Sequence, residues 1–284
     1  MPDSMAAARG RGRLLSYGIL FFLLVIFLTP VFWMVSVSVK TPSNLAVYPI
    51  LFWPPHPAWV NYIEVWRRAT VPRYMLNSIF LSTMYATLVV MTSSLSAYGF
   101  ARCRVRIKNY LFVFVLGTMM IPSIVTIIPQ FVLFHRLGLL NTYWPWAIWG
   151  LQTHAFMIFL LRQFFSTVPV ELEDAAKIDG CNRLRTFVSI FLPISKPALA
   201  AAFVFAFQWI WSDYIPPKLY LQAEKIPFCV ALIQGLSAPF RPDYAPDTPV
   251  QMAGVIYFLV PMVLIFFAVQ RYITQGVVTT GLKG

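Results

Sequence analysis

Six long apolar runs constrain this chain more than any other feature of its sequence. Each holds about 20 residues, enough to cross the hydrocarbon core of a bilayer as a helix. The runs are approximately Leu14–Ser38, Met75–Phe100, Tyr110–Phe134, Tyr143–Leu161, Ile190–Trp211 and Val250–Gln270. Only the fifth contains a charged residue, Lys196. With 59% hydrophobic and 11% charged residues overall, the sequence predicts an all-α polytopic membrane protein with six transmembrane helices.

The distribution of Lys and Arg predicts how these helices are oriented. With six spans both termini share one side, and that side receives 14 of the 22 basic residues, mostly in short loops. An excess of basic residues marks the cytoplasmic side, so we expect a multi-pass protein of the plasma or inner membrane with both termini in the cytoplasm. The first run is too long for a signal peptide and lacks a small-x-small cleavage site, so we expect an uncleaved span.

These expectations divide the chain into a cytoplasmic N-terminal segment, residues 1–13, and one transmembrane domain, residues 14–284. The net charge of +12 then reflects topology and contact with anionic lipid headgroups of the bilayer. It does not indicate nucleic-acid binding, because no basic soluble domain is present to hold a duplex.

The residue types that carry metal or nucleotide chemistry are scattered. The three cysteines fall in different loops, and His56, His135 and His154 form no ligand cluster. The chain also lacks the GxxxxGK[ST] phosphate-binding loop. We therefore expect no catalytic residue, no bound metal and no bound cofactor.

A charged stretch between the fourth and fifth apolar runs has the features of a short helix. Pro169 suits the first turn, Glu171 and Glu173 follow where acidic side chains favour the helix dipole, and Gly180 comes where a left-handed cap is needed. The predicted helix runs from about Pro169 to Asp179. It is either a solvated connector or a docking element for a partner protein.

Two prolines mark the place where the chain returns to the membrane after this helix. Pro193 and Pro197 interrupt backbone hydrogen bonding at the start of the fifth run. We expect the fifth span to begin there at an angle.

A resemblance to a known family favours docking. Glu173, Ala175, Ala176 and Gly180, followed after nine residues by Ile190, Leu192 and Pro193, resemble the EAA loop of ABC importer permeases. Asp174, between Glu173 and the alanines, is the one departure. Further strings resemble the MalG-like permeases of carbohydrate ABC importers: Asn77-Ser78, AYGFARCRV (Ala97–Val105), MIPSIVTIIP (Met120–Pro129), LGLLNTYW (Leu137–Trp144), LRQFF (Leu161–Phe165), Trp211-Ser212-Asp213 and QRYITQGVVTTGLKG (Gln270–Gly284).

The resemblance implies a type I ABC importer permease fold with a cytoplasmic coupling helix in the loop at about 169–197. It implies three kinds of protein partner besides lipid: a second, MalF-like permease, two ATPase subunits that hold ATP and Mg²⁺, and an extracytoplasmic sugar-binding protein. The residues it assigns to ATPase docking are Glu173, Asp174, Ala175, Ala176, Asp179, Gly180, Ile190, Leu192 and Pro193. It also brings the C-terminal tail, residues 281–284, toward the ATPase interface, with a frayed terminus as the alternative.

The residues that contact the substrate are less defined by the sequence. A sugar path needs hydrogen-bonding groups and aromatic faces within the membrane. The candidates are Gln130, Gln152, His154, Gln208, Trp211, Ser212 and Asp213. Each of them could instead pack helices together, and Trp211 could anchor a span at the membrane surface.

Two other functions stay open at this point. An ABC permease of the same branch could carry glycerol phosphate or a polyol, and more distant ones carry phosphate or amino acids. An ion-coupled secondary transporter could also have six spans, but it usually shows an acidic residue within a span and paired repeats. Neither feature is visible in the sequence.

Overall fold

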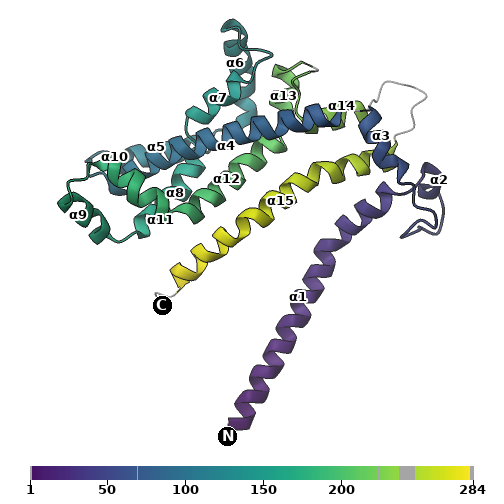
Figure 1. Cartoon of the computed structure of the whole chain (residues 1–284), viewed down its shortest axis with the longest axis horizontal. Helices are drawn as coiled ribbons and strands as arrows, with labels where there is room; N and C mark the ends of the chain where they lie inside the picture. The colour runs from purple at the N-terminus through teal and green to yellow at the C-terminus, as the bar shows by residue number, and fades with distance from the viewer. Residues whose placement is uncertain (1, 69, 223, 237–246, 282–284) are drawn as a thin grey trace. The chain divides into compact units, whose positions relative to one another are not determined.

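The computed structural model describes residues 2–68, 70–222, 224–236 and 247–281, and no strand occurs among them. The all-α prediction is therefore confirmed (Figure 1). The chain forms two compact units, which are described separately below. Unit 1 comprises residues 1–69 and 232–258, and unit 2 comprises residues 70–231 and 259–284. Helices α14 (Phe228–Leu236) and α15 (Thr248–Gly281) each contain residues assigned to both units.

Unit 1 contains α1 (Pro2–Ser38), α2 (Pro42–Leu45) and α3 (Val60–Arg68). The chain that follows α1 folds back onto the end of that helix, where a buried polar cluster holds it. Lys40 is buried, its ammonium group donates to the Leu51 carbonyl, and it lies 4.2 Å from the centre of the Trp33 ring. From α3, Asn61 Nδ2 donates to the carbonyls of Ser38 and Lys40, each at 2.8 Å. These bonds satisfy carbonyls that the helix end leaves without partners.

Unit 2 is built around α4 (Val71–Arg102), which packs against α7 (Trp144–Leu151), α8 (Ala155–Thr167) and α12 (Lys196–Trp211). Figure 1 shows α12 running beside α4. The buried face of α4 carries small residues, among them Ser82, Ala86 and Ala97. Small side chains allow helices to approach closely where lipid provides no hydrophobic drive.

The remaining helices of unit 2 are short. They are α5 (Lys108–Thr118), α6 (Ser123–Arg136), α9 (Val170–Ile178), α10 (Arg183–Thr186), the π-helix η1 (Phe187–Phe191), α11 (Leu192–Ile194) and α13 (Ile215–Tyr220).

Six segments of the described chain can account for the predicted spans. Three single helices are long and apolar enough to cross a membrane: Leu15–Ser38, Val71–Arg102 and Thr248–Arg271. Three bent pairs bring the number to as many as six. The pair Arg183–Ile194 and Lys196–Trp211 bends by 81°. This is the angled start that Pro193 and Pro197 predicted for the fifth span.

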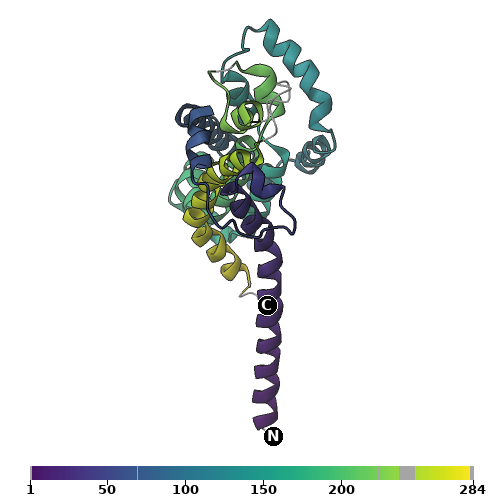
Figure 2. The same cartoon turned by 90° about the vertical axis from the view of Figure 1, so that its right-hand side faces the viewer.

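The third apolar run differs from the continuous helix that its sequence suggested. It consists of α5 and α6, which meet at 90° (Figure 2). The break falls before α6, where Pro122 adopts φ −61° and ψ 129°. Proline lacks an amide hydrogen and disfavours helical geometry in the preceding residue, so α5 cannot continue through it.

The fourth run is also interrupted, between α7 and α8. Thr153, within the break, has φ 69°. The left-handed region is uncommon for a β-branched residue. The break was not predicted, because apolar composition alone does not distinguish a continuous span from a broken one.

The close approach of α7 to α4 gives a first prediction. A Cβ at Gly150 would lie 2.8 Å from Leu88 Cβ and 3.3 Å from the Tyr85 carbonyl oxygen. We expect Gly150→Ala to force these helices apart and to destabilise the protein by about 1–3 kcal/mol. The measurement is the melting temperature of the purified chain in detergent.

Gly117→Ala is the matched control, because no atom lies within 4 Å of a Cβ built at that position. It should leave the melting temperature unchanged or raise it. Equal melting temperatures for wild type and Gly150→Ala would contradict the close packing of α4 and α7.

Candidate functional site

The charged stretch folds as the sequence predicted. Helix α9 spans Val170–Ile178, with Pro169 and Asp179 as its flanking cap residues. Gly180 has φ 76°, which is the left-handed conformation expected of a residue that turns the chain after a helix. After a short turn, Asn182 starts α10 by accepting a hydrogen bond from the Arg185 amide at 2.8 Å.

Helix α9 has an inner and an outer face. Ala176 is 3% exposed and the Glu173 side chain is 14% exposed, so both face the protein. Leu172, Ala175 and Ile178, three residues apart along the helix, face outward, and Ile178 is 87% exposed. We call these three residues the outer ridge. The two alanines of the predicted motif therefore lie in different environments.

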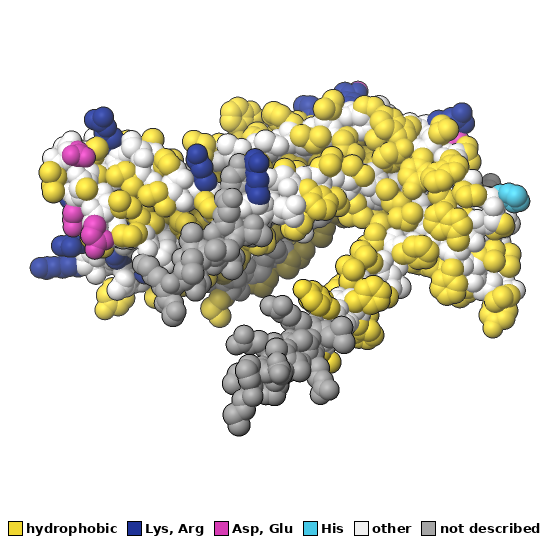
Figure 3. Space-filling view, turned by 60° about the horizontal axis from the view of Figure 1, so that its bottom comes forward, with side chains coloured by type: hydrophobic (Ala, Val, Ile, Leu, Met, Phe, Trp, Pro, Cys, Tyr) yellow, Lys and Arg dark blue, Asp and Glu magenta, His cyan; other side chains and the backbone are white. Residues whose placement is uncertain are grey.

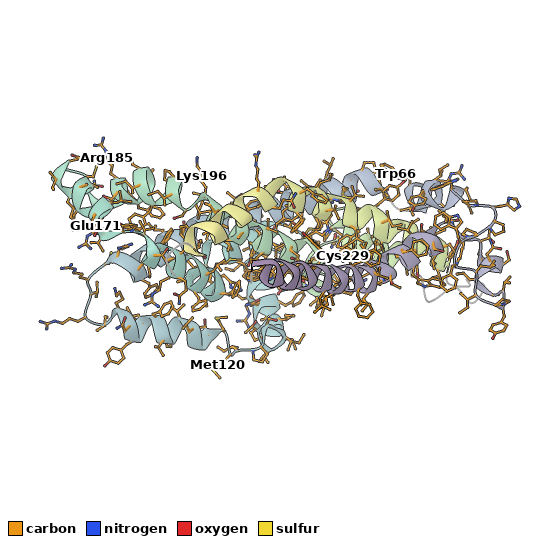
Figure 4. The ribbon with its side chains drawn as sticks, turned by 90° about the horizontal axis from the view of Figure 1, so that it is seen from below. Trp66, Met120, Glu171, Arg185, Lys196 and Cys229 are labelled. Carbon is orange, nitrogen blue, oxygen red and sulfur yellow. The ribbon has the colours of Figure 1, made fainter. Side chains whose placement is uncertain are left out.

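Charged groups flank the outer ridge. Lys177 Nζ lies 2.9 Å from Asp174 Oδ1 and 3.5 Å from Glu173 Oε1. The hydrogen bond to Asp174, together with the negative charge of Glu173, raises the pKa of Lys177. Asp174 and Asp179 are exposed. Figure 3 shows magenta acidic side chains beside dark-blue basic ones at the end of unit 2 that carries α9 and α10, and Figure 4 shows Glu171 and Arg185 at that same end.

The remaining motif residues lie on the returning segment. Ile190 is in η1, and Leu192 and Pro193 are in α11. Ile190 and Leu192 are half-buried, whereas Pro193 is exposed. These three residues therefore lie where the chain re-enters the helix bundle, and they do not belong to the outer ridge of α9.

The sequence did not predict which residues hold the two ends of the segment that carries α9. Arg102, the last residue of α4, donates to the carbonyls of Phe165 and Val168 just before α9. Tyr98 and Phe191 pack in the same place, with ring centres 4.8 Å apart. The one available signal was a basic residue at the end of an apolar run, which is too common to indicate such a contact.

The break in the fourth span holds two of the seven substrate-path candidates. Gln152 is exposed. The His154 amide donates to Ser93 Oγ at 3.2 Å, and the His154 ring lies 4.5 Å from the ring of Trp209 on α12. The break and α12 are therefore in contact.

Four further candidates lie at the end of α12. Trp211 is 1% exposed, and its ring stacks on that of Phe207, one turn earlier on the same helix, with centres 5.5 Å apart. Ser212 Oγ donates to the Gln208 carbonyl at 2.8 Å. Gln208 and Ser212 are exposed and Asp213 is half-buried. The seventh candidate, Gln130, is half-buried on α6.

Within the part of the chain that the structure describes, His, Cys, Asp and Glu form no group of three or more that could hold a metal ion. The C-terminal residues 282–284, assigned by resemblance to the ATPase interface, lie outside the described residues.

Comparison with known proteins agrees with this architecture. A family described as "Binding-protein-dependent transport system inner membrane component" matches residues 90–279, more than half of the chain. The lactose transport system permease protein LacG of Rhizobium radiobacter is 30% identical, over 93% of this chain and 94% of its own. The trehalose/maltose transport system permease protein MalG of Thermococcus litoralis is 30% identical, over 92% and 93%.

The fold also has a close counterpart among solved structures. A chain of a bacterial ABC transporter involved in the import of the acidic polysaccharide alginate matches with a TM-score of 0.77 and 24% identity. The match covers 91% of this chain and 95% of that one. The predicted resemblance to carbohydrate ABC importer permeases is thus confirmed. The chain belongs to the family of binding-protein-dependent transport system inner membrane components.

Proposed function

We propose that this chain is the membrane-spanning permease subunit of an ATP-driven importer that moves a sugar delivered by an extracytoplasmic binding protein. Family membership supports binding-protein-dependent transport. The names of relatives that transport lactose and trehalose or maltose support a sugar as cargo. The same matches favour this function over an ion-coupled transporter. As a permease subunit the chain is not itself an enzyme.

The observation that carries the coupling part of this proposal is the outer ridge of α9. An isoleucine that is 87% exposed on a short charged helix leaves apolar surface in water. Burial of that surface against a partner would be favourable. The small side chain of Ala175, at the middle of the ridge, would let a partner's surface approach the helix closely. We infer that the partner is an ATPase subunit carrying ATP and Mg²⁺.

The proposed assembly contains a second permease, two ATPase subunits and the binding protein. Because 14 of 22 basic residues fall on one side of the predicted topology, we propose that both termini and α9 lie in the cytoplasm. The motif residues then have separate tasks. The outer ridge with Asp174 and Asp179 contacts the ATPase, Glu173 and Ala176 seat the helix on the permease, and Gly180 sets the turn.

For the substrate path we propose the exposed polar groups near the α12 contact, namely Gln152, Gln208 and Ser212, with His154 and Asp213 beside them. A span interrupted within the membrane frees backbone groups that can line a path.

The direct test is ATP hydrolysis by the complex reconstituted in proteoliposomes with the second permease, the ATPase and the binding protein. Monosaccharides, disaccharides, oligosaccharides, polyols and glycerol phosphates are compared. We expect one class of sugar, with its binding protein, to stimulate hydrolysis and to accumulate in the vesicles. Stimulation by glycerol phosphate or a polyol alone would replace the sugar assignment, and failure to assemble with an ATPase would contradict the proposal.

A substitution on the outer ridge tests docking. We expect Ile178→Asp to weaken association with the ATPase subunit about tenfold or more, because it removes an apolar side chain from the contact and buries a charge there. The measurement is co-purification of the ATPase with the permease. Leu184→Asp is the matched control, since Leu184 is also exposed but lies on α10. Equal losses in the two variants would count against the ridge as the contact.

The turn after α9 gives a second test. We expect Gly180→Val to reduce transport per ATP hydrolysed, because a β-branched residue at φ 76° is strained by about 1–2 kcal/mol or more and shifts α9. Nothing lies within 4 Å of a Cβ at this position, so the effect reports backbone conformation and not a clash.

Gly180→Asn is the control, because asparagine tolerates the left-handed region. It should retain most of the transport. Normal transport by Gly180→Val would show that the turn does not position the helix.

A further inference from the structure

Arg102 contacts both the segment that leads into α9 and the segment that returns from it. It is the last residue of α4, the helix around which unit 2 packs. The contacts on the two sides are of different kinds, and together they fix the base of the loop.

On the leading side, Arg102 caps the C-terminus of α8. The last carbonyls of a helix have no partner within it, and a cation is favourable there. Arg102 Nη2 donates to the Phe165 carbonyl at 2.7 Å and also to the Val168 carbonyl. Val168 is buried and extended, with ψ 130°. At this point the chain turns by 77° into α9. The guanidinium therefore sits at the joint between α8 and α9.

On the returning side, the same guanidinium packs against the π-helix η1. Its central carbon lies 5.1 Å from the centre of the Phe191 ring, which is fully buried. Tyr98, one turn before Arg102 on α4, lies 5.2 Å from Phe187 and 4.8 Å from Phe191. Phe165 from α8 completes the group, 5.7 Å from Phe191. Such short π-helical segments occur frequently at functional sites.

We propose that Arg102 is a positioning residue that joins both ends of the docking loop, the loop at about 169–197, to α4, so that a movement of α9 displaces α4. The inference rests on the proposed ATPase docking of α9. A guanidinium can donate two hydrogen bonds and stack on a ring at the same time, whereas a lysine ammonium is a point charge without a planar face. The role therefore requires arginine and not positive charge alone.

The test uses the complex reconstituted with the second permease, the ATPase and the binding protein. It compares Arg102→Lys and Arg102→Met with Arg104→Met, since Arg104 is two residues further along, beyond the end of α4, and is exposed. For both Arg102 variants we expect ATPase co-purification within about twofold of wild type and a fall in transport per ATP hydrolysed of about tenfold. Arg102→Met loses the charge-assisted hydrogen bonds to both carbonyls. Arg102→Lys keeps the charge but lacks the planar group that bonds two carbonyls while it packs on Phe191. Arg104→Met should match wild type in both measurements.

Phe191→Leu provides a second route if Arg102→Met does not fold. It removes the ring against which the guanidinium packs while retaining an apolar side chain, and it too should lower transport per ATP hydrolysed. An unchanged ratio in folded Arg102→Lys and Phe191→Leu would overturn the inference.

Two further outcomes separate the inference from the proposed function. Loss of ATPase binding by the Arg102 variants, in parallel with Ile178→Asp, would mean that Arg102 only maintains the docking surface, and the positioning role would be wrong. A wild-type complex that does not couple hydrolysis to transport would instead refute the proposed function itself.

Discussion

Backbone polar groups in a membrane must find partners within the protein, and each interrupted span depends on how that requirement is met. The fourth span of this chain is interrupted between α7 and α8, and the chain bends again between α8 and α9, where it leaves that span. Side chains of the unbroken helix α4 contact the chain at both places. Thr92 Oγ1 donates to the Gly150 carbonyl at 3.0 Å, Ser93 Oγ accepts from the His154 amide, and Arg102 donates to two carbonyls at the end of α8. Thus the C-terminal part of α4 supports its broken neighbour at both places.

This support explains how α9 can present apolar side chains to water and stay ordered. A short helix is only marginally stable by itself. Here its inner face rests on the protein through Glu173 and Ala176, and its base is held at Val168 and Phe191. The backbone of the outer ridge is then already ordered, which reduces the loss of conformational freedom on binding. A preorganised helix of this kind suits a contact that must transmit movement.

Local patterns in the sequence predicted the apolar segments, α9 and the turn at Gly180, because each depends on neighbouring residues. Features that depend on contacts between distant residues were not predicted. The sequence could not indicate that Glu173 faces inward, that Arg102 reaches the end of α8, or that Trp211 is buried. The break before Pro122 had a local signal in that proline, but the surrounding apolar run was equally compatible with a continuous span.

The same helix that anchors the docking loop also contacts the break at residues 152–154. Ser93 and Arg102 are nine positions apart on α4, which is about 13 Å along a helix axis. Both contacts are hydrogen bonds to backbone groups of the fourth span, so a displacement of α4 relative to α8 changes both together. The break also touches α12 through His154 and Trp209, close to the polar residues Gln208 and Ser212. If Arg102 fixes α9 to α4, the proposed docking site and the proposed substrate path are joined through the C-terminal part of one unbroken helix, and a movement of the proposed ATPase partner would reach both.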